Sequence, residues 1–351
     1  MNRKIKHIES ISSGKQKGKN DDDIFVGEDY AAVIDGVSHK SKIDTENGEM
    51  KIARIITDAI RKLDGTNYAK IMDFDTFVQY VNWYIGRFLR EHGAQEFIGK
   101  MEATGVIYSK QKNQIWLVGD CRAIYDGHVV KNPLKIDDVY IDIRVKIINA
   151  LLQSGYSKEF LRENDISKDI IHHPEKLSNY ISNPEAREEI EEFRRSKIKT
   201  TLLECGFTEE EIEKEDLVLK YYNPRELQAM LKNNPKVCGD YGYAVFNGQY
   251  TEQKNCRVVT LPEDVKSIKL FSDGFSIDSF KKNRDIGYAV RVGWRKTAKD
   301  PLSISINKAT HPAKKYGNGA KESAIDDASA VIIEIVEDKE VSKEKESDEG
   351  R

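Results

Sequence analysis

Three aspartates stand beside apolar runs that lie far apart in the sequence. Asp35 and Asp273 each end such a run and are followed by glycine, and Asp326 comes just before a third run. An Asp-Gly pair is also a common turn, so each acid alone leaves a plain turn open. Because strand ends hold side chains in fixed places, the three together predict a carboxylate cluster that is assembled by folding. Carboxylates are the hard oxygen ligands that Mg²⁺ and Mn²⁺ prefer, so the expected chemistry is that of a divalent metal site.

The elements that must position these acids are strands and two amphipathic helices. Apolar and alternating runs predict strands over 31–35, 103–108, 114–120, 123–128, 241–248, 257–261 and 267–271. Apolar residues at helical spacing predict helices over 48–63 and 75–92. Helices with one apolar face would pack on a sheet, so the sequence predicts an α+β protein.

The overall composition excludes several classes of function. Of 351 residues, 39% are apolar and 33% are charged, which predicts a folded core together with strongly polar segments. The net charge of −3 gives no general argument for binding to nucleic acid or to an anionic membrane. No run approaches the roughly 18 apolar residues of a membrane span. The four cysteines lack Cys-x-x-Cys spacing, so we expect a reducing cytoplasm and no structural zinc site.

Five short motifs occur in an order that resembles a known family. They are Asn20-Asp21-Asp22, Asp35-Gly36, Gly119-Asp120-Cys121-Arg122, Ser272-Asp273-Gly274 and Asp326-Asp327-Ala328-Ser329. Each motif is common alone, but the order resembles that of the metal-dependent serine/threonine protein phosphatases of type 2C. The resemblance covers residues 17–336, apart from a long middle stretch.

The resemblance implies a fold, an activity and a set of metals. The fold would be a four-layer α-β-β-α sandwich of two antiparallel sheets flanked by helices. The activity would be hydrolysis of phosphoserine and phosphothreonine in proteins by a metal-bridged hydroxide, with two Mn²⁺ or Mg²⁺ ions and a third left open. The implied metal ligands are Asp22, Asp35, the carbonyl of Gly36, Asp120, Asp273 and Asp326. Asp278 is a further candidate for the third ion, with its spacing off by one residue.

The sequence departs from the family at three positions near the substrate. Lys17 stands where the family has an arginine that grips the substrate phosphate, and lysine lacks the bidentate fork of arginine. Val37 replaces a histidine that is thought to protonate the leaving group; the nearby His39 could take that role or be a plain loop residue. Cys121 replaces a serine, and the motif places no base beside it, so we do not expect a nucleophile.

The middle and the end of the sequence differ from the rest. Residues 138–235 are rich in charge and in helix formers. We expect a helical insertion into a catalytic domain over 1–336, of a size that usually serves recognition or regulation. Residues 337–351 are nearly all charged and predict a disordered tail.

Two other functions stay open from the sequence. The chain could be a catalytically weak regulator that binds phosphoproteins, or a phosphatase of a small phosphate ester or nucleotide. In the favoured interpretation the partner is a phosphoprotein substrate in a signalling role, without a membrane, and the oligomeric state is undetermined. The basic stretch 281–300 contains Trp294, which suits a nucleic-acid patch, an acidic phosphopeptide or a solvated loop.

Overall fold

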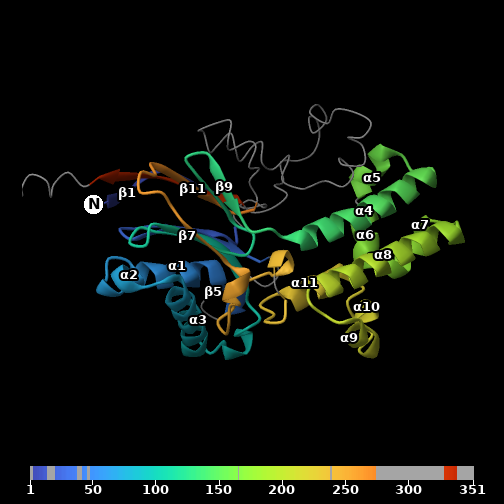
Figure 1. Ribbon diagram of the computed structural model, residues 1–351, viewed down its shortest axis with the longest axis horizontal. Coiled ribbons are helices and arrows are strands. Elements are labelled where there is room, and N and C mark those ends of the chain that lie inside the picture. Colours follow the sequence, from blue (N-terminus) through green and yellow to red (C-terminus); the bar gives the residue numbers. More distant parts are fainter. Residues whose placement is uncertain are drawn as a thin grey trace, which may run out of the picture. The chain divides into compact units, whose positions relative to one another are not determined.

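The chain contains two compact units. The computed structural model describes residues 3–13, 20–37, 42–45, 48–164, 166–237, 239–273 and 328–337. The first unit takes the described residues up to 132 together with 244–273 and 328–337, and the second takes those from 133 to 243. Strands dominate the first unit and helices the second (Figure 1). Within the described ranges, no helix is long and apolar enough to cross a membrane.

The first unit is built on two five-stranded antiparallel sheets. One sheet has the order β1-β12-β11-β8-β9, and the other has the order β10-β7-β6-β3-β2. The first sheet contains β1 (Arg3–Ser13), β8 (Arg122–Tyr125), β9 (His128–Lys131), β11 (Ser267–Phe271) and β12 (Ala328–Glu337). The second contains β2 (Asp23–Val26), β3 (Tyr30–Gly36), β6 (Ala103–Ser109), β7 (Gln114–Val118) and β10 (Arg257–Thr260). A separate hairpin pairs β4 (Lys42–Thr45) with β5 (Gly48–Lys51).

Strand β3 contributes side chains to two cores, because successive residues point to opposite faces of its sheet. Its even-numbered residues, from Tyr30 to Ile34, belong to the core beneath the helices. Ala31 and Val33 belong to the core between the two sheets. Because successive side chains of a strand point to opposite faces, Asp35 continues the row of Ala31 and Val33. The acid is therefore carried to the end of the strand on the side of the other sheet.

Three helices cover the outer face of the sheet that contains β3 (Figure 1): α1 (Ile52–Leu63), α2 (Asn67–Ile71) and α3 (Phe74–Glu91). Trp116 of β7 packs on Phe77 of α3, with ring centroids 5.0 Å apart. Helix α3 begins after Asp73, whose carboxylate accepts a hydrogen bond from the Thr76 N–H at 2.9 Å. A short 3₁₀ turn, η1 (Gln95–Phe97), follows α3.

The predicted α+β class, with two antiparallel sheets and flanking helices, is confirmed. The predicted helix over 48–63 begins only at Ile52, because residues 48–51 pair with 42–45 as a hairpin. No helix among the described residues of the first unit forms a layer over the β1-β12-β11-β8-β9 sheet. The fourth layer of the expected sandwich therefore stays a prediction.

Residues 244–256 form a loop in place of the predicted strand over 241–248. Asn82 of α3 holds it: its side-chain oxygen accepts hydrogen bonds from the N–H groups of Asn247 at 3.2 Å and Gly248 at 3.0 Å. The amide of Asn82 donates to the Thr251 hydroxyl at 2.9 Å. In this described segment, the only β-type pairing is an isolated antiparallel bridge between Ala103 and Phe246. The segment ends in the 3₁₀ turn η4 (Gln253–Asn255). A helix side chain thus supplies hydrogen bonds that a neighbouring strand would otherwise make.

A clasp of two aspartates closes the end of the sandwich where β2 turns into β3. Asp64, after α1, accepts hydrogen bonds from the N–H groups of residues 28–30 at 2.7–3.1 Å. The buried Asp29 accepts from the Gly65 N–H at 3.1 Å and from Gln111 at 2.7 Å, and it pairs with Lys110 at 3.2 Å. Each acid is therefore matched by donors from its own surroundings.

The second unit is a helical lobe with a core of its own. Its elements are α4 (Lys135–Gln153), α5 (Lys158–Asn164), α6 (Ile166–His172), η2 (Pro174–Lys176), α7 (Leu177–Tyr180), α8 (Pro184–Glu204), α9 (Glu209–Lys214), α10 (Leu217–Lys220), α11 (Pro224–Leu231) and η3 (Gly239–Tyr241). The apolar faces of these helices share one buried cluster. Arg194 of α8 is buried in it, donates to the carbonyl of Ile171 at 3.2 Å, and lies over the ring of Tyr222.

Candidate metal centre

Several strand ends of both sheets meet at one end of the sandwich, opposite the clasp. In one sheet, the end of β3 lies beside the start of β6 and the start of β2, as the pairs Asp35–Thr104 and Ile34–Asp23 show. In the other sheet, the end of β11 lies beside the starts of β8 and β12. The short connection from β7 to β8 joins the two sheets at this end. Residues that flank these strand ends are thereby gathered in one region.

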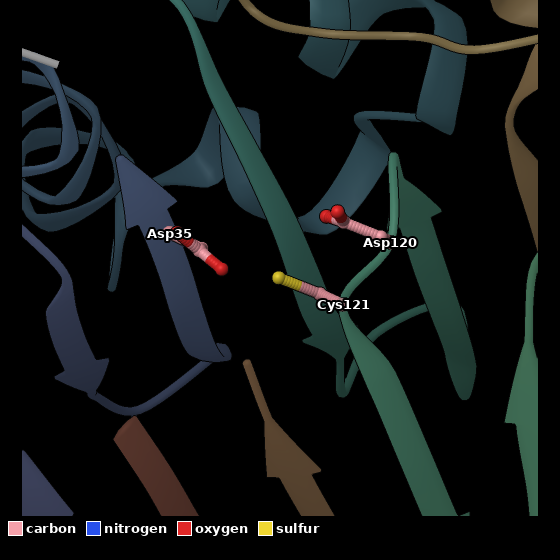
Figure 2. A group of neighbouring side chains, drawn as sticks. All are labelled: Asp35, Asp120 and Cys121. Carbon is pink, nitrogen blue, oxygen red and sulfur yellow. The ribbon is translucent and has the colours of Figure 1, made fainter. Parts of the chain in front are cut away.

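Asp35, Asp120 and Cys121 form the central cluster of this region (Figure 2). One oxygen of each carboxylate and the Cys121 sulfur all lie within 4.8 Å of one another. Asp35 comes from the end of β3, and the other two come from the β7–β8 connection; the side chains of Asp35 and Cys121 point toward each other. Two predicted ligands, Asp35 and Asp120, are therefore brought together although the sequence separates them widely.

The β7–β8 connection is shaped by a glycine and fixed by two hydrogen bonds. Gly119 has φ +85°, a left-handed conformation that glycine adopts without strain. Thr104, directly opposite Asp35 in the sheet, donates from its hydroxyl to Asp120 at 2.8 Å. The amide of Asn132 donates to the Gly119 carbonyl at 2.7 Å. These contacts orient the Asp120 carboxylate before any ligand arrives.

Cys121 is fully buried in the core between the sheets. Burial raises the pKa of its thiol, and the nearby charges of Asp35 and Asp120 raise it further, well above its ordinary value. The Thr104 hydroxyl lies 3.5 Å from the sulfur. A protonated thiol is a poor nucleophile and a poor ligand for a hard cation, so the raised pKa of Cys121 argues against both roles.

Asp22 lies in the same region, on the segment that leads into β2. Alternation places Asp23 on the helical side, where it accepts a 2.5 Å hydrogen bond from Thr57, and therefore places Asp22 on the opposite side. Asp22 is buried, and its charge is a further cause of the raised pKa of the Cys121 thiol. Its N–H donates to the side-chain oxygen of Asn20 at 3.0 Å.

Asn20 ties this segment to the other sheet. Its amide donates to the Ser12 hydroxyl near the end of β1, and Ser12 shares a 2.6 Å hydrogen bond with Ser329 at the start of β12. The carbonyl of Asn20 accepts a hydrogen bond from Lys51 at 2.7 Å. Through these hydrogen bonds, Asn20 fixes the position of Asp22 relative to both sheets.

Of the remaining predicted site residues, some lie within the part of the chain that the structure describes and others lie outside it. Gly36 is the last residue of β3 and pairs with Ala103. Asp273 follows the end of β11 and is half-buried, and it is not part of the group formed by Asp35, Asp120 and Cys121. The predicted residues Lys17, His39, Asp278 and Asp326 lie outside the described residues.

Thr104 and Lys51 are site residues that sequence reasoning missed. Thr104 becomes important only through its register opposite Asp35, and Lys51 only through a hairpin that was not predicted. Neither carries a local motif. A polar residue at the second position of the predicted strand over 103–108 was the one available signal for Thr104.

The donor set fits divalent cations such as Mg²⁺ or Mn²⁺. The carboxylates of Asp22, Asp35 and Asp120 are oxygen donors of one charge sign, and all three act on the Cys121 thiol. Like charges gathered in a partly buried region repel each other, and a divalent cation relieves that repulsion. The residues present can therefore hold a hard metal ion, while the neutral thiol beside them contributes no charge.

Comparison with solved structures finds phosphatases with low sequence identity. A serine/threonine phosphatase of Mycobacterium tuberculosis, PstP/Ppp, is 12% identical, with 94% of this chain and 98% of that chain covered and a TM-score of 0.41. The catalytic domain of PstP in complex with two manganese ions is 13% identical, with 96% and 100% covered and a TM-score of 0.39. PppA, a type VI secretion regulator of Pseudomonas aeruginosa, is 13% identical, with 95% and 100% covered and a TM-score of 0.40. At these values the likeness assigns no activity to this chain.

No protein-family model matches the sequence, and no curated protein matches it.

Proposed function

We propose that this chain is a metal-dependent phosphatase that hydrolyses phosphoserine and phosphothreonine in proteins. One observation carries the proposal: Asp35 and Asp120, from separate motifs of the type 2C pattern, meet within 4.8 Å in a partly buried region of like charge. The order of the five motifs supports the choice of phosphate esters over other substrates of metal-dependent hydrolases.

The proposed metal ligands are those of the motif pattern. Asp35, the Gly36 carbonyl, Asp273 and Asp326 would hold two Mn²⁺ or Mg²⁺ ions, and Asp22 and Asp120 would hold or orient an additional one. When bound, such ions activate a water molecule and neutralise charge on the phosphoryl group.

The residues of the chain have the task of fixing the carboxylates. Thr104 orients Asp120, and Asn20 fixes the segment of Asp22, so that the oxygen donors keep their places. Lys17 is proposed to bind the substrate phosphate and His39 to protonate the leaving oxygen. The buried Cys121 thiol lies beside the carboxylates of Asp35 and Asp120, and its raised pKa disfavours a nucleophilic role.

We also propose that the helical lobe is an insertion into this catalytic domain, with predicted bounds 138–235. The lobe has a separate apolar core, which supports a self-contained folding unit. Its role would be selection of the phosphoprotein substrate.

The test is hydrolysis of an aryl phosphate and of a phosphothreonine peptide by the full chain. We expect activity with added Mn²⁺ or Mg²⁺ and its loss, by at least about 100-fold, in excess chelator. Binding of Mn²⁺, measured by calorimetry, should be lost in the Asp35→Asn variant. Full activity in chelator would contradict the proposal, and metal binding without hydrolysis of any phosphate ester would leave a binding protein in its place.

A further inference from the structure

The β4–β5 hairpin has an apolar face and a charged face. Ile43 and Met50 pack on the core beneath the helices. Lys42 and Lys51 are directly opposite each other in the register of the two strands. Because alternate residues share a face, both lysines and Glu49 lie on the side away from Ile43 and Met50. Two like charges in direct opposition are unfavourable unless an anion lies between them.

Glu49 is that anion. Its two carboxylate oxygens lie 2.6 Å from the Lys42 ammonium and 3.1 Å from the Lys51 ammonium. Hydrogen bonds from Lys42 and Lys51 lower the pKa of the Glu49 carboxyl, which stays charged. The side chains of Lys42, Lys51 and Glu49 are 34%, 24% and 35% exposed, so solvent reaches all three. An external carboxylate could therefore replace that of Glu49 without entering the core.

The charged face borders the candidate metal centre. Lys51 donates to the carbonyl of Asn20 at 2.7 Å and lies 4.0 Å from the Asp21 carboxylate. Asn20 in turn accepts the hydrogen bond from the N–H of Asp22. The pair of lysines is thus connected, through one residue, to a proposed metal ligand.

We propose that Lys42 and Lys51 form an anion subsite beside the metal centre, which binds an acidic residue of the phosphorylated substrate when that residue displaces Glu49. The inference rests on the proposed function and narrows its substrate class to phosphopeptides with Asp or Glu near the phosphorylated residue. Glu49 acts as an internal competitor: it holds the lysines in place and makes weakly acidic sequences poorer substrates. Ammonium–carboxylate contacts of this kind discriminate by charge and geometry.

The experiment compares two phosphothreonine peptides that differ only in flanking residues, Asp and Glu in one and Asn and Gln in the other. The ratio of their kcat/KM values in Mn²⁺ measures the preference for acidic substrates. We expect the wild type to prefer the acidic peptide. Lys42→Gln should reduce this ratio about fivefold, as the loss of one accessible charge contact predicts. Glu49→Gln should raise the ratio, because the competitor loses its charge while keeping its shape.

Lys70→Gln is the matched control, since Lys70 is exposed on α2 and donates a hydrogen bond to the side chain of Asn67 at 3.3 Å, away from the hairpin. It removes the same charge from the same unit and should leave the ratio unchanged. Circular dichroism melting would establish that all variants are folded. If Lys42→Gln and Glu49→Gln change both peptides by the same factor, or if Lys70→Gln lowers the ratio equally, the subsite is refuted.

A binding measurement separates this inference from the proposed function. Fluorescence anisotropy with the labelled acidic peptide is run in chelator, where no hydrolysis is expected. We expect affinity to be highest in Glu49→Gln, intermediate in the wild type and lowest in Lys42→Gln. That order would support the subsite even in a chain that hydrolyses no phosphate ester. Equal affinities in all three would refute it even in an active phosphatase.

Discussion

The two ends of the sandwich treat aspartate in opposite ways. At the clasp, Asp29 meets Lys110 and Gln111, and Asp64 accepts three backbone N–H groups, so each charge is matched from within the chain. At the other end, Asp22, Asp35 and Asp120 surround a neutral thiol and add charges of one sign. The first arrangement stabilises a fold. The second gathers charges of one sign, which suits a cation from outside, so the same residue type stabilises the fold at one end and is proposed to bind metal at the other.

The largest expected effect is on activity, from Asp35→Asn. The substitution keeps the shape of the side chain and removes one negative charge from the cluster. We expect kcat/KM for an aryl phosphate to fall at least about 100-fold, because metal binding and water activation fail together. The midpoint of thermal unfolding without metal should hold or rise, because repulsion among the carboxylates is reduced.

Glu96→Gln is the control for charge alone, since Glu96 is exposed on η1. It should leave both activity and melting unchanged. A normal rate of hydrolysis by Asp35→Asn in saturating Mn²⁺ would contradict the proposal that the acidic end binds metal while the clasp only stabilises the fold.

The next effect is on the connection that carries Asp120. In Gly119→Ala, the new Cβ would overlap the side chain of Thr104 and approach the Ala244 carbonyl to 3.1 Å, at a backbone φ of +85°. Strain and overpacking together should lower the free energy of unfolding by about 2–6 kcal/mol. Activity per folded molecule should also fall, because Thr104 orients Asp120.

Gly127→Ala provides the comparison, because its φ is +91° and nothing lies within 4 Å of the added Cβ. It has the backbone strain without the overlap, and should cost about 1–2 kcal/mol with no change in activity. Urea unfolding of both variants measures the difference. If Gly119→Ala and Gly127→Ala lower the free energy of unfolding equally, the side chain of Thr104 must move aside to accommodate the new methyl group.

A smaller loss of stability alone is expected from Asp64→Asn at the clasp. The neutral amide has one oxygen where the carboxylate has two, so it loses the charge and also at least one of the three hydrogen bonds from backbone N–H groups. We expect the free energy of unfolding to fall by about 1–3 kcal/mol. Metal affinity and kcat/KM of the folded protein should not change. A loss of Mn²⁺ affinity in calorimetry would show that the two ends are coupled.

The smallest effect is a pH dependence that arises from Asp29. Burial raises the pKa of Asp29, but hydrogen bonds from Gln111 and Lys110 and the Lys110 charge outweigh it and hold that pKa below its ordinary value of 3.8. The folded state therefore binds this proton less readily than the unfolded state. The stabilisation is present above about pH 4 and is lost as the pH falls through the lowered pKa.

Urea unfolding of the wild type and Asp29→Asn from pH 6 to pH 2 checks this expectation. The wild type should lose stability more steeply below about pH 4, and the gap between the two proteins should narrow. A gap that stays constant across this range would mean that Asp29 has the same pKa in both states.

Local patterns in the sequence predicted much of the fold. The apolar run over 31–35 and the apolar spacing along α3 are properties of neighbouring residues, and both elements were predicted correctly. The prediction of a strand over 241–248 was wrong, because the side chain of Asn82 in α3 accepts the hydrogen bonds from the N–H groups of Asn247 and Gly248. Residues 48–51 became a strand because residues 42–45 pair with them. In both cases a distant partner decided the local structure.

The candidate site divides in the same way. Asp35 was proposed from the sequence because it ends a strand-like run, and Asp120 was proposed because the family resemblance implied it. Their meeting depends on the β3–β6 register and on the left-handed turn at Gly119, which no local pattern specifies. The roles of Thr104 and Lys51 were recognised only from such pairings in the structure. Non-local contacts, and not residue types, limited the prediction.

The pairing of β1 with β12 has a consequence for the order of events during protein synthesis. Arg3 pairs with Glu337, so β1 cannot complete its pairing until residue 337 has left the ribosome. Such long-range pairing is intrinsically slow to form. The helical lobe, built from contacts within 133–243, can fold earlier. Because Ser12 and Ser329 can join only once β12 has been made, the acidic end of the sandwich is completed after the helical lobe.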